Sequence, residues 1–125
     1  MSNTTRTGRR RTPPFVMLDH RILDSPAWVD LGGTAAKLLL LMARLYNGSN
    51  NGELFLAERA AAEAIGVRRG AAAAAFDDLE AHGFIRATKR GAFSVKVKLA
   101  TSWRLTFHPT MTAAATHDYR EWRPE

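Results

Sequence analysis

Residues 54–99 decide the fold, and they read LFLAERAAAEAIGVRRGAAAAAFDDLEAHGFIRATKRGAFSVKVKL. An apolar start leads into an alanine-rich segment at 58–65, and Gly66 separates that segment from a longer one at 68–82. Both segments carry apolar residues at the spacing of one helical face, and two runs of alternating apolar and polar residues follow them. This order predicts a strand, a helix, a tight turn, a second helix and a β-hairpin.

A central helix is expected upstream of this stretch. Residues 35–46 are apolar at the positions of a helix that is buried over most of its girth, and Thr34 stands where its cap is expected. A shorter helix is expected at 26–31, because Ser25 and Pro26 form a favourable helix start. The second helix of the pair would pack on the central helix through one apolar face. That face consists of Ala72, Ala75, Phe76 and Leu79.

The predicted hairpin is strongly basic. Residues 85–88 and 93–99 would form its strands, and 89–91 would form its turn. No Asp or Glu occurs between residues 81 and 117. We therefore expect a cationic hairpin face and tip beside the second helix, suited to a polyanionic partner. The candidate contacts on this hairpin are Arg86, Lys89, Arg90, Lys96 and Lys98.

Two arginines stand at the start of the second helix. The helix dipole disfavours cations there by about 0.3–1 kcal/mol, and an anionic partner would reverse that penalty. Arg68 and Arg69 are therefore candidate DNA contacts, because arginine binds guanine or phosphate through paired hydrogen bonds. The alternative is that both are solvated. The exposed helix face lacks Asn, Gln and Ser, so we expect mainly phosphate contacts and limited sequence preference.

Composition predicts one folded domain with a basic arm and a tail. The chain has 125 residues, a net charge of +6 and 46% hydrophobic residues, which is enough for one core. We expect a flexible arm at 1–14, the domain at 15–107 and a tail at 108–125 that could hold a short docking helix at 113–122. The arm would lie along phosphates or in a minor groove, or would serve only solubility. Its candidate contacts are Arg9, Arg10 and Arg11.

Several function classes find no support in the sequence. The chain has no cysteine, so no disulfide or thiolate metal site is expected. Its four histidines are far apart, and it has neither a phosphate-binding loop nor a nucleophile elbow, so we expect no enzyme, no cofactor and no metal. It has no apolar run of about 18 residues and no secretory signal, so we expect a cytoplasmic protein without a membrane partner. Nothing in the sequence indicates a small-molecule ligand.

The stretch 60–85, AAAEAIGVRRGAAAAAFDDLEAHGFI, resembles the core of many bacterial winged helix-turn-helix proteins. The upstream stretch 23–48, LDSPAWVDLGGTAAKLLLLMARLYNG, is similar to the lead-in of winged-helix domains in phage- and plasmid-type regulators and replication proteins. The resemblance covers about residues 15–107. It implies an α+β fold with a three-helix core and a C-terminal β-hairpin wing. It also implies that Ala71 and Ala73 lie with Arg68 and Arg69 near the major groove.

These expectations leave more than one function open. The first is a transcriptional regulator that binds double-stranded DNA, alone or as a homodimer. The second is a protein-interaction module in a replication or phage assembly context, since winged helices also bind proteins. The third is a replication-initiation protein that binds repeated sites near an origin. The sequence identifies neither a target site nor the sign of regulation.

Overall fold

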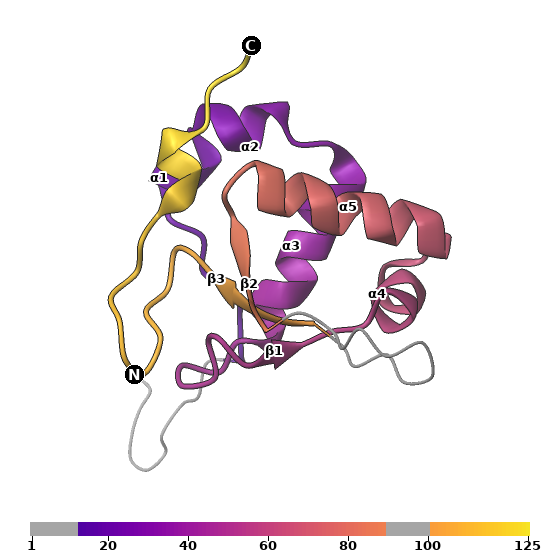
Figure 1. The fold of residues 1–125 in the computed structure, drawn as a ribbon, viewed down its shortest axis with the longest axis horizontal. Coiled ribbons are helices and arrows are strands. Elements are labelled where there is room, and N and C mark those ends of the chain that lie inside the picture. Colours follow the sequence, from indigo (N-terminus) through magenta and orange to yellow (C-terminus); the bar gives the residue numbers. More distant parts are fainter. Residues whose placement is uncertain (1–12, 90–100) are drawn as a thin grey trace.

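The computed structural model describes residues 13–89 and 101–125, and gives the backbone alone for Lys89 (Figure 1). The described chain belongs to the α+β class, as the sequence predicts. Its elements in chain order are α1 (His20–Leu23), α2 (Pro26–Asp30), α3 (Gly33–Leu45), β1 (Leu54–Phe55), α4 (Glu58–Ile65), α5 (Arg69–Ala81), β2 (Ile85–Lys89), β3 (Ser102–Leu105) and the 3₁₀ helix η1 (Asp118–Glu121).

Two short helices lead into the core. Ser25 caps α2 as predicted, because its hydroxyl accepts the backbone N–H of Trp28 at 3.2 Å. The same hydroxyl donates to the carbonyl of Ile22 at 2.6 Å, so it also joins α2 to α1. The sequence did not predict α1, since four residues are too few to show a helical period. The preceding residues 13–18 form no helix or strand, and the side chains of Phe15 and Met17 are exposed.

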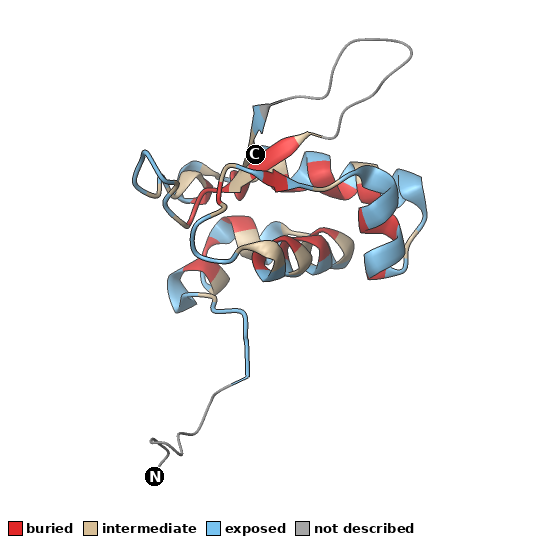
Figure 2. Ribbon diagram, turned by 90° about the horizontal axis from the view of Figure 1, so that it is seen from below, coloured by how far each residue is buried: buried red, intermediate tan, exposed pale blue. Residues whose placement is uncertain are grey.

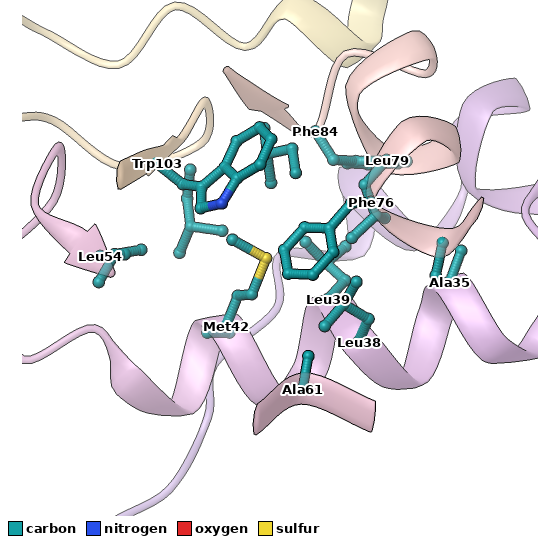
Figure 3. Packing of buried hydrophobic residues seen from close by; sticks show 14 of the residues in the cluster. Ala35, Leu38, Leu39, Met42, Leu54, Ala61, Phe76, Leu79, Phe84 and Trp103 are labelled. Carbon is teal, nitrogen blue, oxygen red and sulfur yellow. The ribbon is translucent and has the colours of Figure 1, made fainter. Parts of the chain in front are cut away.

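The central helix α3 carries the largest share of the core. Leu38, Leu39 and Met42 are completely buried, and they point toward α5 and the sheet (Figure 3). The expected cap at Thr34 is wrong: the helix begins after Gly32 and has no side-chain cap. Burial of its apolar face stabilises the start of this helix in place of a capping hydrogen bond.

The helix pair and its turn agree with the sequence prediction. Helix α4 ends at Gly66, which adopts a left-handed conformation at φ +75°. The N–H groups of Gly66 and Val67 both donate to the carbonyl of Ala62, at 2.9 and 3.0 Å, which closes the end of α4. The predicted inner face of α5 is buried, and Phe76 stacks on Trp103 of β3 at 5.4 Å between ring centroids.

The three described strands form an antiparallel sheet in the order β1-β3-β2. Leu54 lies opposite Trp103, and Ile85 lies opposite Leu105, so β3 is the central strand. The hairpin partner that the sequence predicts for β2, at 93–99, lies outside the described residues. Within them, β3 fills that place. Figure 2 shows the buried residues on the facing sides of the sheet and helices, with exposed residues on the outer sides.

The C-terminal tail packs against the same core. Tyr119 of η1 is 1% exposed and stacks on Phe84 at 5.4 Å. Helix is limited to Asp118–Glu121, shorter than the sequence suggests. One reason is that His117 adopts a left-handed conformation, φ 52°, which interrupts a helix. No helix in the described ranges is long and apolar enough to cross a membrane.

Candidate nucleic-acid interface

The start of α5 presents the predicted arginines to solvent. Arg68 is the N-cap residue and is exposed, and the side chain of Arg69 is 61% exposed. Ala71 is exposed as well, whereas Ala73 is half-buried. The N-cap residue Arg68 makes no side-chain cap, so the first N–H groups of α5 and its two arginines offer donors to an anion.

Among the described residues, Arg69 has one ion-pair partner. Its Nε atom lies 3.7 Å from Oε1 of Glu58, the first residue of α4. Both side chains are about half exposed, and an ion pair of this kind contributes roughly 0–1 kcal/mol. The pair orients Arg69 beside the start of α4, and a phosphate could replace Glu58 at little cost.

The charge of α5 changes sign along its length. Arg68 and Arg69 stand at its start, whereas Asp77 and Asp78 are exposed in its later turns. At 1.5 Å per residue, Arg69 and Asp77 are separated by about 12 Å along the axis. The acidic end would repel phosphates, so only the first half of the helix is suited to approach DNA.

Arg86, a predicted contact on the hairpin, is bound within the protein. Its Nε donates to Oδ2 of Asp118 at 2.9 Å, and one of its terminal N–H groups donates to the carbonyl of Glu80 at 2.6 Å. The side chain therefore joins β2 to the end of α5 and to η1. Sequence reasoning could not find this role, because the carboxylate partner lies 32 residues away in the chain.

The other predicted contacts carry most of the excess charge but are not described. Lys89 ends β2 with only its backbone described, and the rest lie outside the described residues. Eight of the 18 Lys and Arg residues belong to 1–12 and 89–100, where there is no Asp or Glu. The other ten accompany all 12 carboxylates, so the remainder of the chain has a net charge of −2. The undescribed contacts are Arg90, Lys96, Lys98, Arg9, Arg10 and Arg11.

His82, His108 and His117 contact other residues of the fold. Nε2 of His82 lies 2.9 Å from the carboxylate of Asp30, and the ring of His108 stacks on Tyr46 at 4.1 Å. Burial lowers the pKa of His108 and of His117, which favours their neutral forms. Among residues 13–89 and 101–125, no group of three or more His, Asp or Glu side chains could hold a metal ion.

One basic residue was overlooked by the sequence analysis. Arg104 on β3 is half-buried and lies opposite Arg86 of β2 in the strand register. Its terminal N–H group donates to the hydroxyl of Thr116 at 2.9 Å. Neither the register nor the position of Thr116 can be read from local sequence, so nothing in the sequence distinguishes Arg104 from a solvated arginine.

Comparison with family models, with curated proteins and with solved structures finds no match for the chain.

Proposed function

We propose that this chain is a winged helix-turn-helix protein that binds double-stranded DNA and regulates transcription. The main observation in support is the exposed start of α5, which has no cap from its N-cap residue. This start bears Arg68 and Arg69 and follows α4 after a glycine turn. Helix α3 packs against both helices from the inner side, and Ala71 and Ala74 on the outer side of α5 are exposed to a DNA groove. The basic segment that joins β2 to β3 would form the wing.

In this mechanism, the first half of α5 enters a major groove. Arg69 exchanges Glu58 for a phosphate or a guanine edge, and the small side chain of Ala71 allows close approach. The basic segments at 1–12 and 89–100 contact the flanking phosphates. Since arginines are the main side chains able to read bases here, sequence preference is modest.

Selection of bound duplexes from a random pool, followed by sequencing, tests the proposal directly. We expect an enriched site and weaker binding by Arg69→Ala, with a loss of about 1–3 kcal/mol on that site if Arg69 reads guanine. Arg44→Ala is a matched control, because Arg44 is exposed on the last turn of α3. Equal loss on every sequence would assign Arg69 to phosphate, and no binding to any duplex would remove the proposal.

A second pair of variants probes the same arginine in the opposite direction. Glu58→Gln removes the carboxylate that competes for Arg69, so affinity for DNA should rise about twofold to fivefold. Glu63→Gln changes the net charge equally and is also exposed on α4. An equal rise in both variants, measured by fluorescence anisotropy, would contradict a specific role for the Glu58–Arg69 pair.

The acidic second half of α5 favours one alternative. Asp77 and Asp78 are unsuited to phosphate, and the small residues on the outer face would allow another helix to pack closely. A protein-interaction module in a replication or phage assembly context fits these features. A replication-initiation protein would instead be distinguished by selection of repeated sites from origin DNA.

A further inference from the structure

A groove lies along the sheet, between residues 49–53, which precede β1, and the segment 110–116. Its volume is about 440 Å³, within the range of small-molecule sites. Arg104 and Thr88 line it from the strands, and Thr112 and Thr116 line it from the segment. None of these residues belongs to the candidate DNA interface at the start of α5.

Among the described residues that line this groove, Arg104 carries the positive charge. Its strand neighbours Trp103 and Leu105 are buried, so by strand alternation Arg104 projects to the outer face of the sheet. Arg86 lies directly opposite on β2, and like charges at such positions are unfavourable. Asp118 neutralises Arg86 at 2.9 Å, whereas no carboxylate in the described ranges lies within 4.0 Å of the Arg104 guanidinium. An anion at Arg104 would supply the missing counter-charge.

The walls of the groove fit both parts of a small phosphorylated molecule. Thr116 accepts an N–H of Arg104, which leaves its hydroxyl hydrogen available for another acceptor. Arginine and hydroxyl groups are frequent donors to phosphate oxygens. Met111, which is 77% exposed, and Ala114 form an apolar wall for an organic group. Glu53 also lines the groove and disfavours ligands with a large negative charge.

We propose that this groove binds a small phosphate monoester, with Arg104 and Thr116 holding its phosphate and Met111 covering its organic part. None of the residues that hold this ligand belongs to the start of α5, and the test below requires no DNA.

Titration of the ¹⁵N-labelled protein with adenosine monophosphate tests this site. We expect saturable shifts of the amide signals of residues 112–116 and of the Arg104 side-chain N–H. Inorganic phosphate should shift the same signals at least about tenfold more weakly, because it lacks an organic part. Adenosine alone should leave them unchanged. Equal shifts with adenosine, or shifts confined to Arg68 and Arg69, would overturn the proposal.

Three variants localise the effect. Arg104→Gln should weaken binding at least about tenfold, while Glu53→Gln should strengthen it about twofold to fivefold by removing the opposing charge. Lys37→Gln, at an exposed position on α3, changes the net charge as Arg104→Gln does and should leave affinity unchanged. The midpoint of thermal unfolding provides a second readout. Adenosine monophosphate should raise it for the natural chain and not for Arg104→Gln, and an equal rise in both would overturn the proposal.

Discussion

Gly83 allows the C-terminal tail to cross the connection between α5 and β2. It has φ +82°, and a Cβ atom there would lie 2.8 Å from the backbone carbonyl of Asp118 and from the N atom of Tyr119. No real Cβ makes contacts this close to backbone atoms, so any side chain would displace the tail. The following residue, Phe84, stacks on Tyr119. The packing of η1 in this position therefore requires that residue 83 have no side chain.

Replacing Gly83 by alanine should destabilise the protein by more than about 2 kcal/mol. The left-handed conformation alone costs an L-residue roughly 1–2 kcal/mol, and the collision with the tail adds to it. Gly66→Ala is the control, because Gly66 has φ +75° but a Cβ atom there would meet no other atom within 4 Å. It should cost only about 1 kcal/mol. Urea unfolding of both variants measures the difference, and equal losses would show that the close approach has no energetic effect.

His108 makes stability depend on pH. Burial, and to a lesser extent the charge of His117, lowers the pKa of His108 below its ordinary value of 6.5. The unfolded chain then binds a proton more readily than the folded one. The contribution of His108 to the free energy of unfolding is therefore present above about pH 6.5 and is lost as the pH falls. Asp19 acts in a different window, because Arg21 holds the pKa of that carboxyl well below 3.8.

The variant His108→Phe should reduce this loss. Phenylalanine retains an aromatic ring to stack on Tyr46, now 4.1 Å from the His108 ring, but has no proton to bind. The unfolding free energy of the natural chain should therefore fall more steeply between about pH 7.5 and 5.5 than that of the variant. Chemical unfolding at several pH values provides the comparison. Parallel curves would mean that His108 is not responsible for the acid sensitivity.

At the scale of elements, Arg86 holds three of them together. From its position on β2, it donates to Asp118 in η1 and to the carbonyl of Glu80 at the end of α5. A side chain held in this way contributes to folding stability through internal hydrogen bonds, whereas an exposed hairpin arginine would contribute to DNA binding. The two roles can be separated by experiment.

Arg86→Ala should lower the unfolding free energy by about 1–2 kcal/mol, since its partners lose charge-assisted hydrogen bonds. DNA affinity at a temperature where the variant is folded should stay within about twofold of the natural chain. A double-mutant cycle with Asp118→Ala, measured by urea unfolding, isolates the ion pair. Loss of DNA affinity without loss of stability would mean that Arg86 contacts DNA and has no stabilising role.

The helices were easier to predict than their surroundings. Helices α4 and α5 were anticipated within about one residue at each end, because helical period, Gly66 and the alanine-rich composition are local signals. Thr34 failed as a cap because Gly32 occupies that position, and the choice between neighbouring starts depends on packing. Of the candidate site, the exposure of Arg68 and Arg69 could be anticipated, but the pairing of Arg69 with Glu58 could not.

At the scale of the whole molecule, charge is divided unevenly. The segments 1–12 and 89–100 contain eight basic residues and no acidic ones, while the remainder has a net charge of −2. A polyanion would therefore be attracted mainly by these two segments, because the remainder of the chain is slightly acidic overall. Affinity for DNA should consequently depend strongly on salt.

Contacts with about five phosphates predict a log–log slope of affinity against salt near −4.5. Replacing Arg9, Arg10 and Arg11 by serine should make that slope shallower by up to about 2.7, if each contacts one phosphate. Anisotropy titrations between low and physiological salt measure both slopes. An unchanged slope would mean that the arm contributes only to solubility.

By itself, the sequence determined the α+β class, the central helix, the helix pair with its glycine turn and the arginines at the start of α5. These features depend on residues within a few positions of one another, so local conformational preference and hydrophobic period suffice. Only the tertiary structure decided that β3 is the partner of β2, that Arg86 faces Asp118, that Arg104 lacks a carboxylate partner in the described ranges, and that the tail packs over Gly83. Those outcomes join residues far apart in the chain, and the packing of the whole core sets their register.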